Sequence, residues 1–269
     1  MSAADLRRVG AIARKELITL TSYRIAMMTR FLTVWYFAIS FYFIADFVGT
    51  PDAIADVEGG YFGFVLVGAV VTSFATAGVS AFPAQIAEEQ DEGTLEAVLS
   101  TPTPLWTMVA GGFVVPMVFV LAETGVLVAV GLGLLGDGVP VLGLTRALPF
   151  LMLTTASFAA LGIAAAAFLV LVKRGDPFSG PVRQLTLLLS GALYPTATLP
   201  GWVELLSRLV PATYGVRATR ALVGGASYRE TLDEAVVLAG FTAVALPLAV
   251  WLFRRAITVA RRSGTLGTY

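Results

Sequence analysis

Acidic residues gather in one short polar stretch of an otherwise apolar chain. Glu88, Glu92 and Glu96 follow each other at four-residue spacing, which predicts that they share one face of a helix. Like charges at that spacing repel by about a few tenths of a kcal/mol per pair, a cost that favours a basic surface opposite them. The alternative is a solvated acidic loop that only keeps the surface soluble, and the spacing alone leaves both open. The stretch between Ser80 and Leu105 carries five carboxylates and no Lys or Arg, namely Glu88, Glu89, Asp91, Glu92 and Glu96.

Other reactive groups are scarce in the sequence. The chain has no Cys and no His, which excludes disulfides, thiolate chemistry and His-based zinc or haem sites. It also lacks a G-x-x-x-x-G-K-[ST] phosphate loop, so we expect no ATP hydrolysis by this chain. We therefore predict no catalytic residue, no metal site and no cofactor. A net charge of zero argues against nucleic acid as a partner.

The elements that must position these residues are long apolar helices. Hydrophobic residues make up 57% of the chain and charged residues 13%, whereas a soluble domain carries about 25% charged residues. The charge-free runs are close to the roughly 20 residues that a helix needs to cross a bilayer. The sequence predicts an all-α membrane protein with a six-span domain over 27–253. The predicted spans are 27–48, 60–82, 105–135, 147–172, an interrupted span from about 183, and 235–253.

The segment before the first span has an amphipathic pattern. Apolar residues from Leu6 to Leu20 recur at three- and four-residue spacing, and Arg7, Arg8, Arg14 and Lys15 project from the opposite side. This pattern predicts a helix over 1–26 that lies on the membrane surface, with an ordinary basic tail as the alternative. No cleavable signal peptide is visible, so we expect the first span to act as the insertion signal.

The distribution of basic residues predicts the orientation. If the N-terminus is inside, 13 of the 18 Lys and Arg residues fall in inner segments, as the positive-inside rule requires. We therefore expect a plasma-membrane protein with both termini cytoplasmic, ending in a tail over 254–269. The acidic stretch then faces the cytoplasm.

Three prolines, Pro195, Pro200 and Pro211, interrupt the chain after the fifth predicted span. Broken helices are tolerated at membrane depth only where protein or a water-filled cavity surrounds them. We therefore predict an outer cap over 195–225 with two re-entrant half-helices, at 202–209 and 214–223. A plain extracellular loop with two surface helices is the alternative. The cap is expected to place Arg208, Arg217 and Arg220 at the outer interface, paired with Glu204 or lipid headgroups.

The acidic stretch resembles a motif of the ABC-transporter type-2 permeases. Glu89-Gln-Asp-Glu92-Gly93-Thr94-Leu95-Glu96-Ala-Val-Leu99-Ser-Thr-Pro102 is similar to the family's E-x-x-x-G-T-L-E-x-L-x-x-[ST]-P segment. The resemblance implies a cytoplasmic coupling helix over 84–101, between spans 2 and 3, which docks onto an ATP-binding subunit. The residues to which it assigns this role are Glu88, Glu89, Glu92, Gly93, Thr94, Leu95, Glu96, Leu99 and Pro102.

Two further stretches resemble the same family, in the family's order. Lys15-Glu16-Leu17 is similar to its basic-Glu-Leu element in the N-terminal interface helix. The region before the last span resembles its l-P-x-w, P-x-x-y and R-x-l signature. The residues concerned, with Pro195 beside them, are Pro200, Trp202, Pro211, Tyr214 and Arg220.

The family resemblance implies a function. It implies the membrane subunit of a prokaryotic ABC exporter, which moves a hydrophobic drug, a lipid or a lipid-linked glycan outward; the acidic motif leans toward the drug or lipid group. The expected partners are a second copy of the chain, forming a homodimer, and two ATP-binding subunits that hold ATP and Mg. A secondary transporter or channel is the alternative, but it needs ionisable groups at the midplane of several spans, and only Glu123 qualifies.

Within the spans, Trp35, Tyr42 and Glu123 are candidates for a translocation path. An ionisable residue near mid-span should face the bundle interior and be paired or protonated. Contact of Glu123 with substrate and a hydrogen bond to Thr154 or Ser157 both stay open. The aromatic first span is either a pathway wall or lipid-facing bulk, and we favour the second. Two small-residue ridges predict close helix packing, within a subunit or across a dimer: Ala69, Ser73, Ala77 and Ala81, and Ala156, Ala160 and Ala164.

Overall fold

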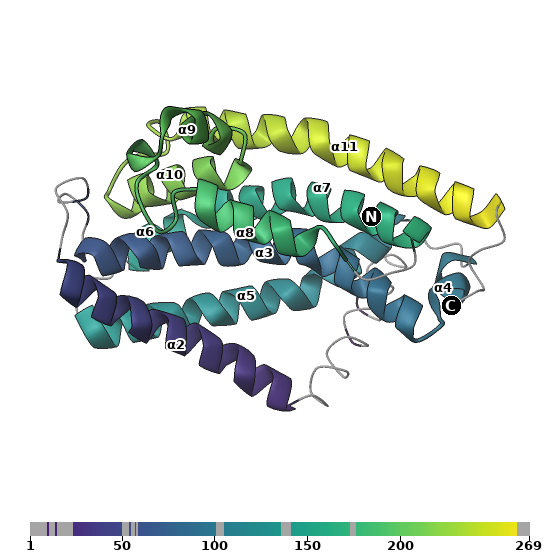
Figure 1. The fold of residues 1–269 in the computed structure, drawn as a ribbon, viewed down its shortest axis with the longest axis horizontal. Helices are drawn as coiled ribbons and strands as arrows, with labels where there is room; N and C mark the ends of the chain where they lie inside the picture. The colour runs from purple at the N-terminus through teal and green to yellow at the C-terminus, as the bar shows by residue number, and fades with distance from the viewer. Residues whose placement is uncertain are drawn as a thin grey trace.

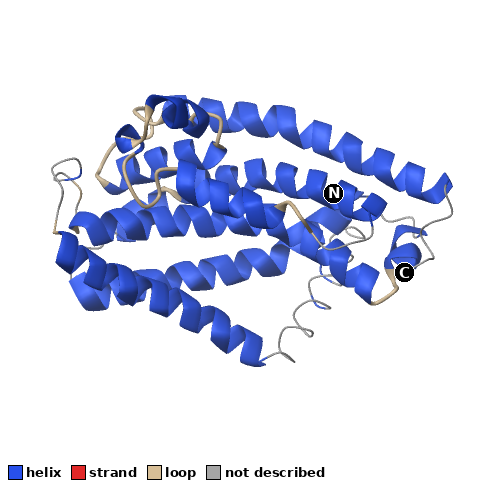
Figure 2. Cartoon of the chain, in the orientation of Figure 1, coloured by secondary structure: helices blue, strands red, loops and turns tan. Residues whose placement is uncertain are grey.

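A computed structural model describes most of the chain. It covers Gly10, Arg14, residues 24–49, Ile54, Val57 and residues 59–100, 105–135, 141–172 and 176–262. In these residues every regular element is a helix, and turns and loops join them (Figure 2), which confirms the all-α prediction. Most of the predicted interface helix, including Lys15, Glu16 and Leu17, and the tail after Arg262 lie outside the described residues.

Five helices are long and apolar enough to cross a membrane. They cover the first four predicted spans and the last one, and the boundaries of the third span agree residue for residue with the prediction. The second and last helices are longer than predicted because each continues past the apolar run into polar sequence. The five helices are α2 (Arg24–Val48), α3 (Gly60–Asp91), α5 (Leu105–Leu135), α7 (Leu148–Val172) and α11 (Leu232–Arg262).

The fifth predicted span is not a long helix. Its place is taken by α8 (Ser179–Leu189), whose 11 residues fall short of the roughly 20 that a crossing needs. The helix stops because Gly191 adopts a left-handed conformation, with φ of 74°, and Pro195 follows shortly after. Within the described residues the chain therefore has five helices long enough to cross a membrane and one short segment at the place of the interrupted fifth span.

Short helices occupy the predicted outer cap. The segment contains η3 (Thr196–Thr198), α9 (Gly201–Ser207) and α10 (Pro211–Val223), and α9 and α10 match the two predicted half-helices closely. A further short helix, α6 (Val141–Arg146), leads directly into α7. The prolines set these boundaries, because a proline is readily accommodated at a helix N-terminus, where its missing N–H is not needed.

The long helices pack around α3, which lies in the centre of the molecule (Figure 1). On one side α7 packs along α3, and α11 packs along α7 as the outer helix; on the other side lie α5 and then α2. The helices α6, α9 and α10 gather at one end of the bundle, which we name the α10 end. The opposite end, where α11 finishes beside α4 (Leu95–Ser100), is named the α4 end.

The contact between α3 and α7 is tight enough to require glycine. A Cβ atom on Gly78 would stand 2.6 Å from the carbonyl oxygen of Thr155, and one on Gly162 would stand 2.7 Å from that of Val79. Both distances are shorter than real side chains allow, so the backbones touch only because these two Cβ atoms are missing. Small residues thus serve packing within the subunit here.

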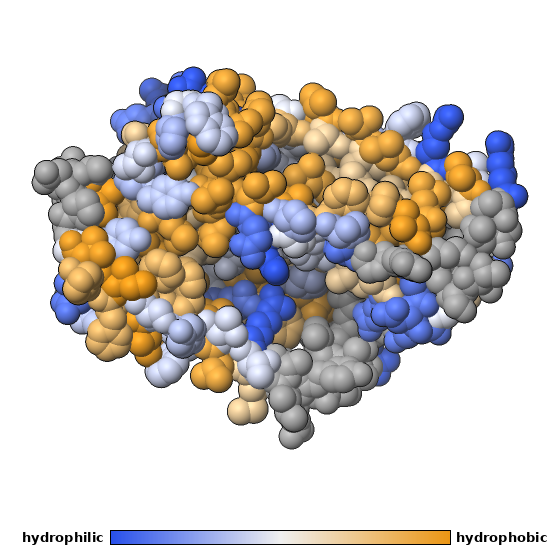
Figure 3. Space-filling model, in the orientation of Figure 1, coloured by the Kyte–Doolittle hydropathy of each residue, from blue (hydrophilic) through white to orange (hydrophobic). Residues whose placement is uncertain are grey.

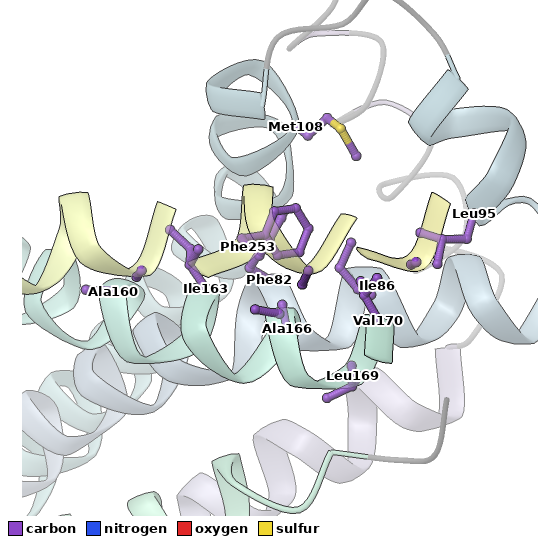
Figure 4. Packing of buried hydrophobic residues seen from close by; sticks show 14 residues of the cluster. Phe82, Ile86, Leu95, Met108, Ala160, Ile163, Ala166, Leu169, Val170 and Phe253 are labelled. Atoms are coloured by element: carbon purple, nitrogen blue, oxygen red, sulfur yellow. The ribbon is translucent and has the colours of Figure 1, made fainter. Parts of the chain in front are cut away.

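A hydrophobic core joins five helices, α3, α4, α5, α7 and α11, at the α4 end (Figure 4). Phe82 of α3 packs edge-on against Phe253 of α11, with ring centroids 5.1 Å apart. Leu95 of α4 is fully buried in the same core, beside Ile86 of α3 and Val170 of α7. Burying a leucine side chain contributes about 1.5–3 kcal/mol, so α4 is anchored in the bundle by its first residue.

Candidate functional site: an acidic turn, a polar cavity and a cap held by Arg220

The acidic stretch is built around the end of α3. The helix continues through Pro83 to Asp91 and is followed by a separate helix, α4, of six residues. The predicted coupling helix over 84–101 is therefore wrong in its bounds. Residues 84–91 are the last turns of α3, and the short helix starts only at Leu95.

Gly93 ends α3 in a Schellman motif. The N–H of Gly93 donates to the carbonyl of Gln90 at 3.1 Å, and the N–H of Thr94 donates to that of Glu89 at 2.9 Å. These two bonds define the motif, and its glycine takes the left-handed conformation that other residues avoid. The φ of Gly93 is 68°. The Gly-Thr pair of the motif thus turns the chain from α3 into α4.

The turn separates the acidic residues that were predicted to share a face. Glu88 lies on α3, Glu92 caps its end, and Glu96 lies in the first turn of α4, so the three do not form one stripe. Glu92 and Glu96 are exposed at this end of the bundle, and Glu96 also stands where a helix favours negative charge.

Two neighbouring side chains hold the turn rather than face outward. Glu89 is buried and accepts a hydrogen bond from the hydroxyl of Thr94. Gln90 is also buried, and its amide donates to the carbonyl of Leu169 on α7 at 3.2 Å. The turn is therefore fastened to α7 as well as to α4. Pro102 and the side chain of Leu99 lie outside the described part of the chain.

A polar cavity of about 610 Å³ opens between α2, α3, α5 and α8. Figure 3 shows hydrophilic residues gathered in a hollow between α8 and α2, on a face that is otherwise largely hydrophobic. Most of the α3 wall consists of small or hydroxyl-bearing residues, including Ser73, Ala77 and Ala81 of the predicted ridge. The lining residues on α3 are Thr72, Ser73, Thr76, Ala77, Ser80, Ala81 and Ala84; the others include Arg30, Thr33, Glu123, Arg183 and Gln184.

An ion pair crosses this cavity. The Nε of Arg30 on α2 donates to the carboxylate of Glu123 on α5, whose side chain is 8% exposed against 45% for Arg30. The guanidinium of Arg30 also lies 5.2 Å from the ring centroid of Phe119. Glu123 is thus paired, but with neither Thr154 nor Ser157. Ser157 instead lies 2.9 Å from the hydroxyl of Thr242 on α11.

The aromatic path candidates lie elsewhere. Tyr42 packs edge-on against Phe62, with ring centroids 5.8 Å apart, and half of the Trp35 side chain is exposed on α2. Neither is among the residues that line the polar cavity. Of the three candidates, Glu123 is the one that the structure brings to it.

Arg220 locks the cap onto the bundle. Its Nη1 donates to the carbonyl of Gly191 at 2.8 Å, and its Nη2 donates to those of Phe64 at 3.1 Å and Ala192 at 3.0 Å. The guanidinium also lies 3.4 Å from the ring centroid of Phe64. Burial lowers the pKa of Arg220 to about 9, which leaves it protonated at neutral pH.

This position corrects the prediction that Arg220 faces lipid headgroups. The carbonyls of Gly191 and Ala192 follow the end of α8 and so have no partner within that helix, and the guanidinium donates to both. Arg208 pairs with Glu204, one of the two predicted partners: its Nη2 donates to the Glu204 carboxylate at 2.9 Å. Arg217 is exposed and lies 3.5 Å from the hydroxyl of Thr196.

The remaining cap residues shape the short helices. Pro195 precedes η3, Pro200 precedes α9, and Pro211 is the first residue of α10. The hydroxyl of Tyr214 donates to the carbonyl of Arg208 at 2.9 Å, which joins α10 to α9. Trp202 points away from the bundle and is largely exposed.

Long apolar helices around a polar, ion-paired cavity define a multi-pass membrane protein of the transporter type. The chain belongs to the ABC-2 type transporter family, whose model matches residues 7–223. It is 27% identical over 177 residues to ABC transporter G family member 20 of Dictyostelium discoideum, a match that covers 65% of this chain and 24% of that protein. The chain thus spans about a quarter of this relative's length. Members of this family form the membrane-embedded permease domain of ABC transporters. The chain is therefore the membrane part of an ABC transporter.

Proposed function

We propose that this chain is the permease subunit of an ATP-driven exporter whose ATP-binding subunits are separate polypeptides. ATP and Mg are bound by those subunits, and this chain performs no catalysis. The cargo is a hydrophobic drug, a lipid or a lipid-linked glycan, and it moves outward across the plasma membrane. The observation that carries the proposal is the polar cavity, because a membrane-level cavity with an ion pair and several hydroxyl groups accommodates the polar part of an amphipathic molecule.

The proposed orientation places the α4 end in the cytoplasm, with both chain termini. Four arginines (Arg254, Arg255, Arg261 and Arg262) lie in the last turns of α11 at that end, as the positive-inside rule favours. The α10 end is then outside, and α9 and α10 form a re-entrant cap there. The buried backbone contacts of Arg220 support this, because polar groups at membrane depth need partners within the protein.

The turn at residues 92–94, which we name the coupling turn, transmits motion from the ATP-binding subunits together with α4. Glu92 and Glu96 are exposed and meet a basic surface of the partner. Leu95 anchors α4 in the core that contains Phe82, Val170 and Phe253. A push on α4 therefore reaches α3, α7 and α11 together, because tightly packed cores shift as units rather than deform.

A second copy of the chain completes the transport path. The cavity is open on the face between α2 and α8, and α2 exposes large aromatic side chains, such as Tyr36, Phe43 and Phe47. A homodimer built on this face would enclose the two cavities, and each copy would bind one ATP-binding subunit.

Charge reversal at the coupling turn tests the proposal. In vesicles containing the permease and its ATPase partner, Glu92→Lys with Glu96→Lys should abolish ATP-dependent export and the stimulation of ATPase activity by cargo. Asp233→Lys is the matched control, because Asp233 is an exposed acid in the first turn of α11 at the opposite end. Export that survives the double reversal would refute the coupling role. Export driven by an ion gradient without ATP would favour the secondary-transporter alternative.

A further inference from the structure

A second, apolar hollow lies on the other side of α5 from the polar cavity. It has a volume of about 420 Å³, and its walls come from α5 on one side and from α7 and α11 on the other. It exists because α5 packs on α2 and α3, whereas α11 packs on α7 and α10. We name it the α5–α11 groove. Its lining residues are Trp106, Val109, Ala110, Phe113, Met117, Met152, Thr155, Ala156, Ala159, Ile163, Leu246, Val250 and Arg254.

Like one leaflet of a membrane, the groove is polar at one end and apolar along the rest of its length. Trp106 and Arg254 lie at its α4 end, and the remaining wall is almost entirely aliphatic, aromatic or thioether. The hydroxyl of Thr155 donates to the carbonyl of Leu151 at 2.9 Å, so it adds little polarity to the wall. From Trp106 to Met117 the groove extends along α5 for about 16 Å at the rise of an α-helix, which is about half of the hydrocarbon thickness.

The mouth of the groove carries a positive charge. Arg254 is exposed, and none of the ion pairs or ring contacts found among the described residues uses its guanidinium. The next residue, Arg255, differs, because its guanidinium lies 5.6 Å from the ring centroid of Trp251. A tryptophan at the interface with an arginine beside an apolar groove matches the polarity of a phospholipid, with the phosphate at the arginine and an acyl chain along the wall.

We propose that the α5–α11 groove is a resident binding site for an anionic phospholipid. The acyl chain lies between α5 and the α7–α11 pair, and the headgroup phosphate accepts hydrogen bonds from Arg254. The lipid fills a space that the helices leave open and supports α5, the helix that carries Glu123 on the cavity side. The site is separate from the transport path and does not depend on the exporter proposal.

Fluorescence quenching at Trp106 measures occupancy of the groove. A variant with Trp35→Phe, Trp202→Phe and Trp251→Phe keeps Trp106 as its only tryptophan. The full-length variant is placed in phosphatidylcholine bilayers that contain increasing fractions of phosphatidylglycerol brominated on its acyl chains. We expect the quenching of Trp106 to correspond to a local phosphatidylglycerol fraction about fivefold above its bulk fraction. One arginine at the membrane surface attracts anionic lipid by about 1 kcal/mol, which corresponds to this enrichment. Brominated phosphatidylcholine should quench according to its bulk fraction.

Four variants distinguish binding in the groove from binding to the general protein surface. Arg254→Gln should abolish the enrichment, and Arg255→Gln, which removes the same charge at the same depth, should leave it nearly unchanged. Ala110→Phe should fill the groove and reduce quenching by both lipids; if that variant does not fold, Ala156→Val provides a milder filling. A normal thermal transition of each variant confirms that the fold is retained.

Several outcomes would overturn the proposal. Equal quenching by the two lipids, or an equal loss in Arg254→Gln and Arg255→Gln, would mean that Arg254 selects no headgroup. No quenching by either lipid would mean that protein, such as a second copy of the chain, covers the groove. Loss of quenching on adding ATP and the partner subunit would identify the lipid as cargo and not as a resident ligand. None of these results bears on the coupling role of α4, which the Glu92 and Glu96 variants test separately.

Discussion

Arg30 on α2 and Glu123 on α5 form an ion pair within the polar cavity. The pair joins the most peripheral long helix to the bundle, at a place where α2 otherwise offers mainly aromatic and aliphatic contacts. It also neutralises the carboxylate of Glu123, which has little access to solvent. This contact thus supports the attachment of α2 and leaves Arg183 as the other charged side chain that lines the cavity among the described residues.

Replacing one partner of this pair should lower the free energy of unfolding more than replacing both partners. We expect Arg30→Gln to lower the free energy of unfolding by about 3 kcal/mol, because it leaves a mostly buried carboxylate without a counterion. Adding Glu123→Gln should recover part of that loss. Denaturant unfolding in detergent measures both variants. Glu204→Gln, in the exposed pair with Arg208, serves as the control and should cost less than about 1 kcal/mol.

Replacing Arg220 should loosen the cap. Arg220→Gln would leave several buried carbonyl groups without a hydrogen-bond donor. Each such group should lower the free energy of unfolding by about 1–3 kcal/mol. Arg220→Lys should recover only part of the loss, because one ammonium group cannot reproduce the planar fork. Arg217→Gln, on the exposed side of the same helix, should change the stability by no more than about 0.5 kcal/mol. Equal effects of Arg217→Gln and Arg220→Gln on the melting temperature would contradict the assigned role.

Gly162→Ala should force α3 and α7 apart. The added methyl group would overlap the backbone of α3, and overpacking of this kind costs about 1–3 kcal/mol. Gly125→Ala in α5 is the matched control because nothing lies within 4 Å of its added Cβ. Since alanine is the better helix former, Gly125→Ala should be neutral or slightly stabilising. Thermal unfolding of the two variants compares them directly.

Substitutions at Gly93 should follow the tolerance of each residue for the left-handed conformation. No atom lies within 4 Å of an added Cβ there, so the backbone alone sets the cost. Gly93→Val should cost about 1–2 kcal/mol and displace α4, whereas Gly93→Asn should be mild because asparagine enters this region more readily. Under the exporter proposal, stimulation of the ATPase should fall in the same order. A valine variant with full stimulation would show that the turn does not position α4 for coupling.

Much of the helical frame could be predicted because membrane spans are encoded locally. α5 begins directly after Pro104 and ends directly before Gly136, and both residues are helix breakers that the sequence shows. The starts of α9 and α10 are likewise marked by Pro200 and Pro211. The end of α3 was misplaced for a physical reason: a change from apolar to polar sequence does not stop a helix. The hydrogen bonds of α3 continue past Pro83 until Gly93 turns the chain. Gly93 was the signal for that end, and it was assigned to the coupling motif but not used as a helix stop.

The long-range contacts could not be predicted, since they depend on how helices tilt and where they end. For Glu123 the sequence left open a contact with substrate or a hydroxyl partner on a neighbouring helix, and the structure instead brings Arg30 of α2 to it. Arg220 was expected at the headgroups because the carbonyls that attract it become available only when α8 stops at Gly191. A glycine shortly before Pro195, in an apolar run, was the visible sign of that stop.

The contacts of Arg220 have a consequence for the order of assembly during synthesis. Its acceptor on Phe64 lies 156 residues earlier in the chain, and the other two lie in the turn after α8. A ribosome-bound chain that has not yet delivered α10 therefore holds these carbonyls without their donor. The α10 end of the bundle can therefore be completed only after α10 has been synthesised. Packing of the first third of the chain thus depends on a contact from the last third.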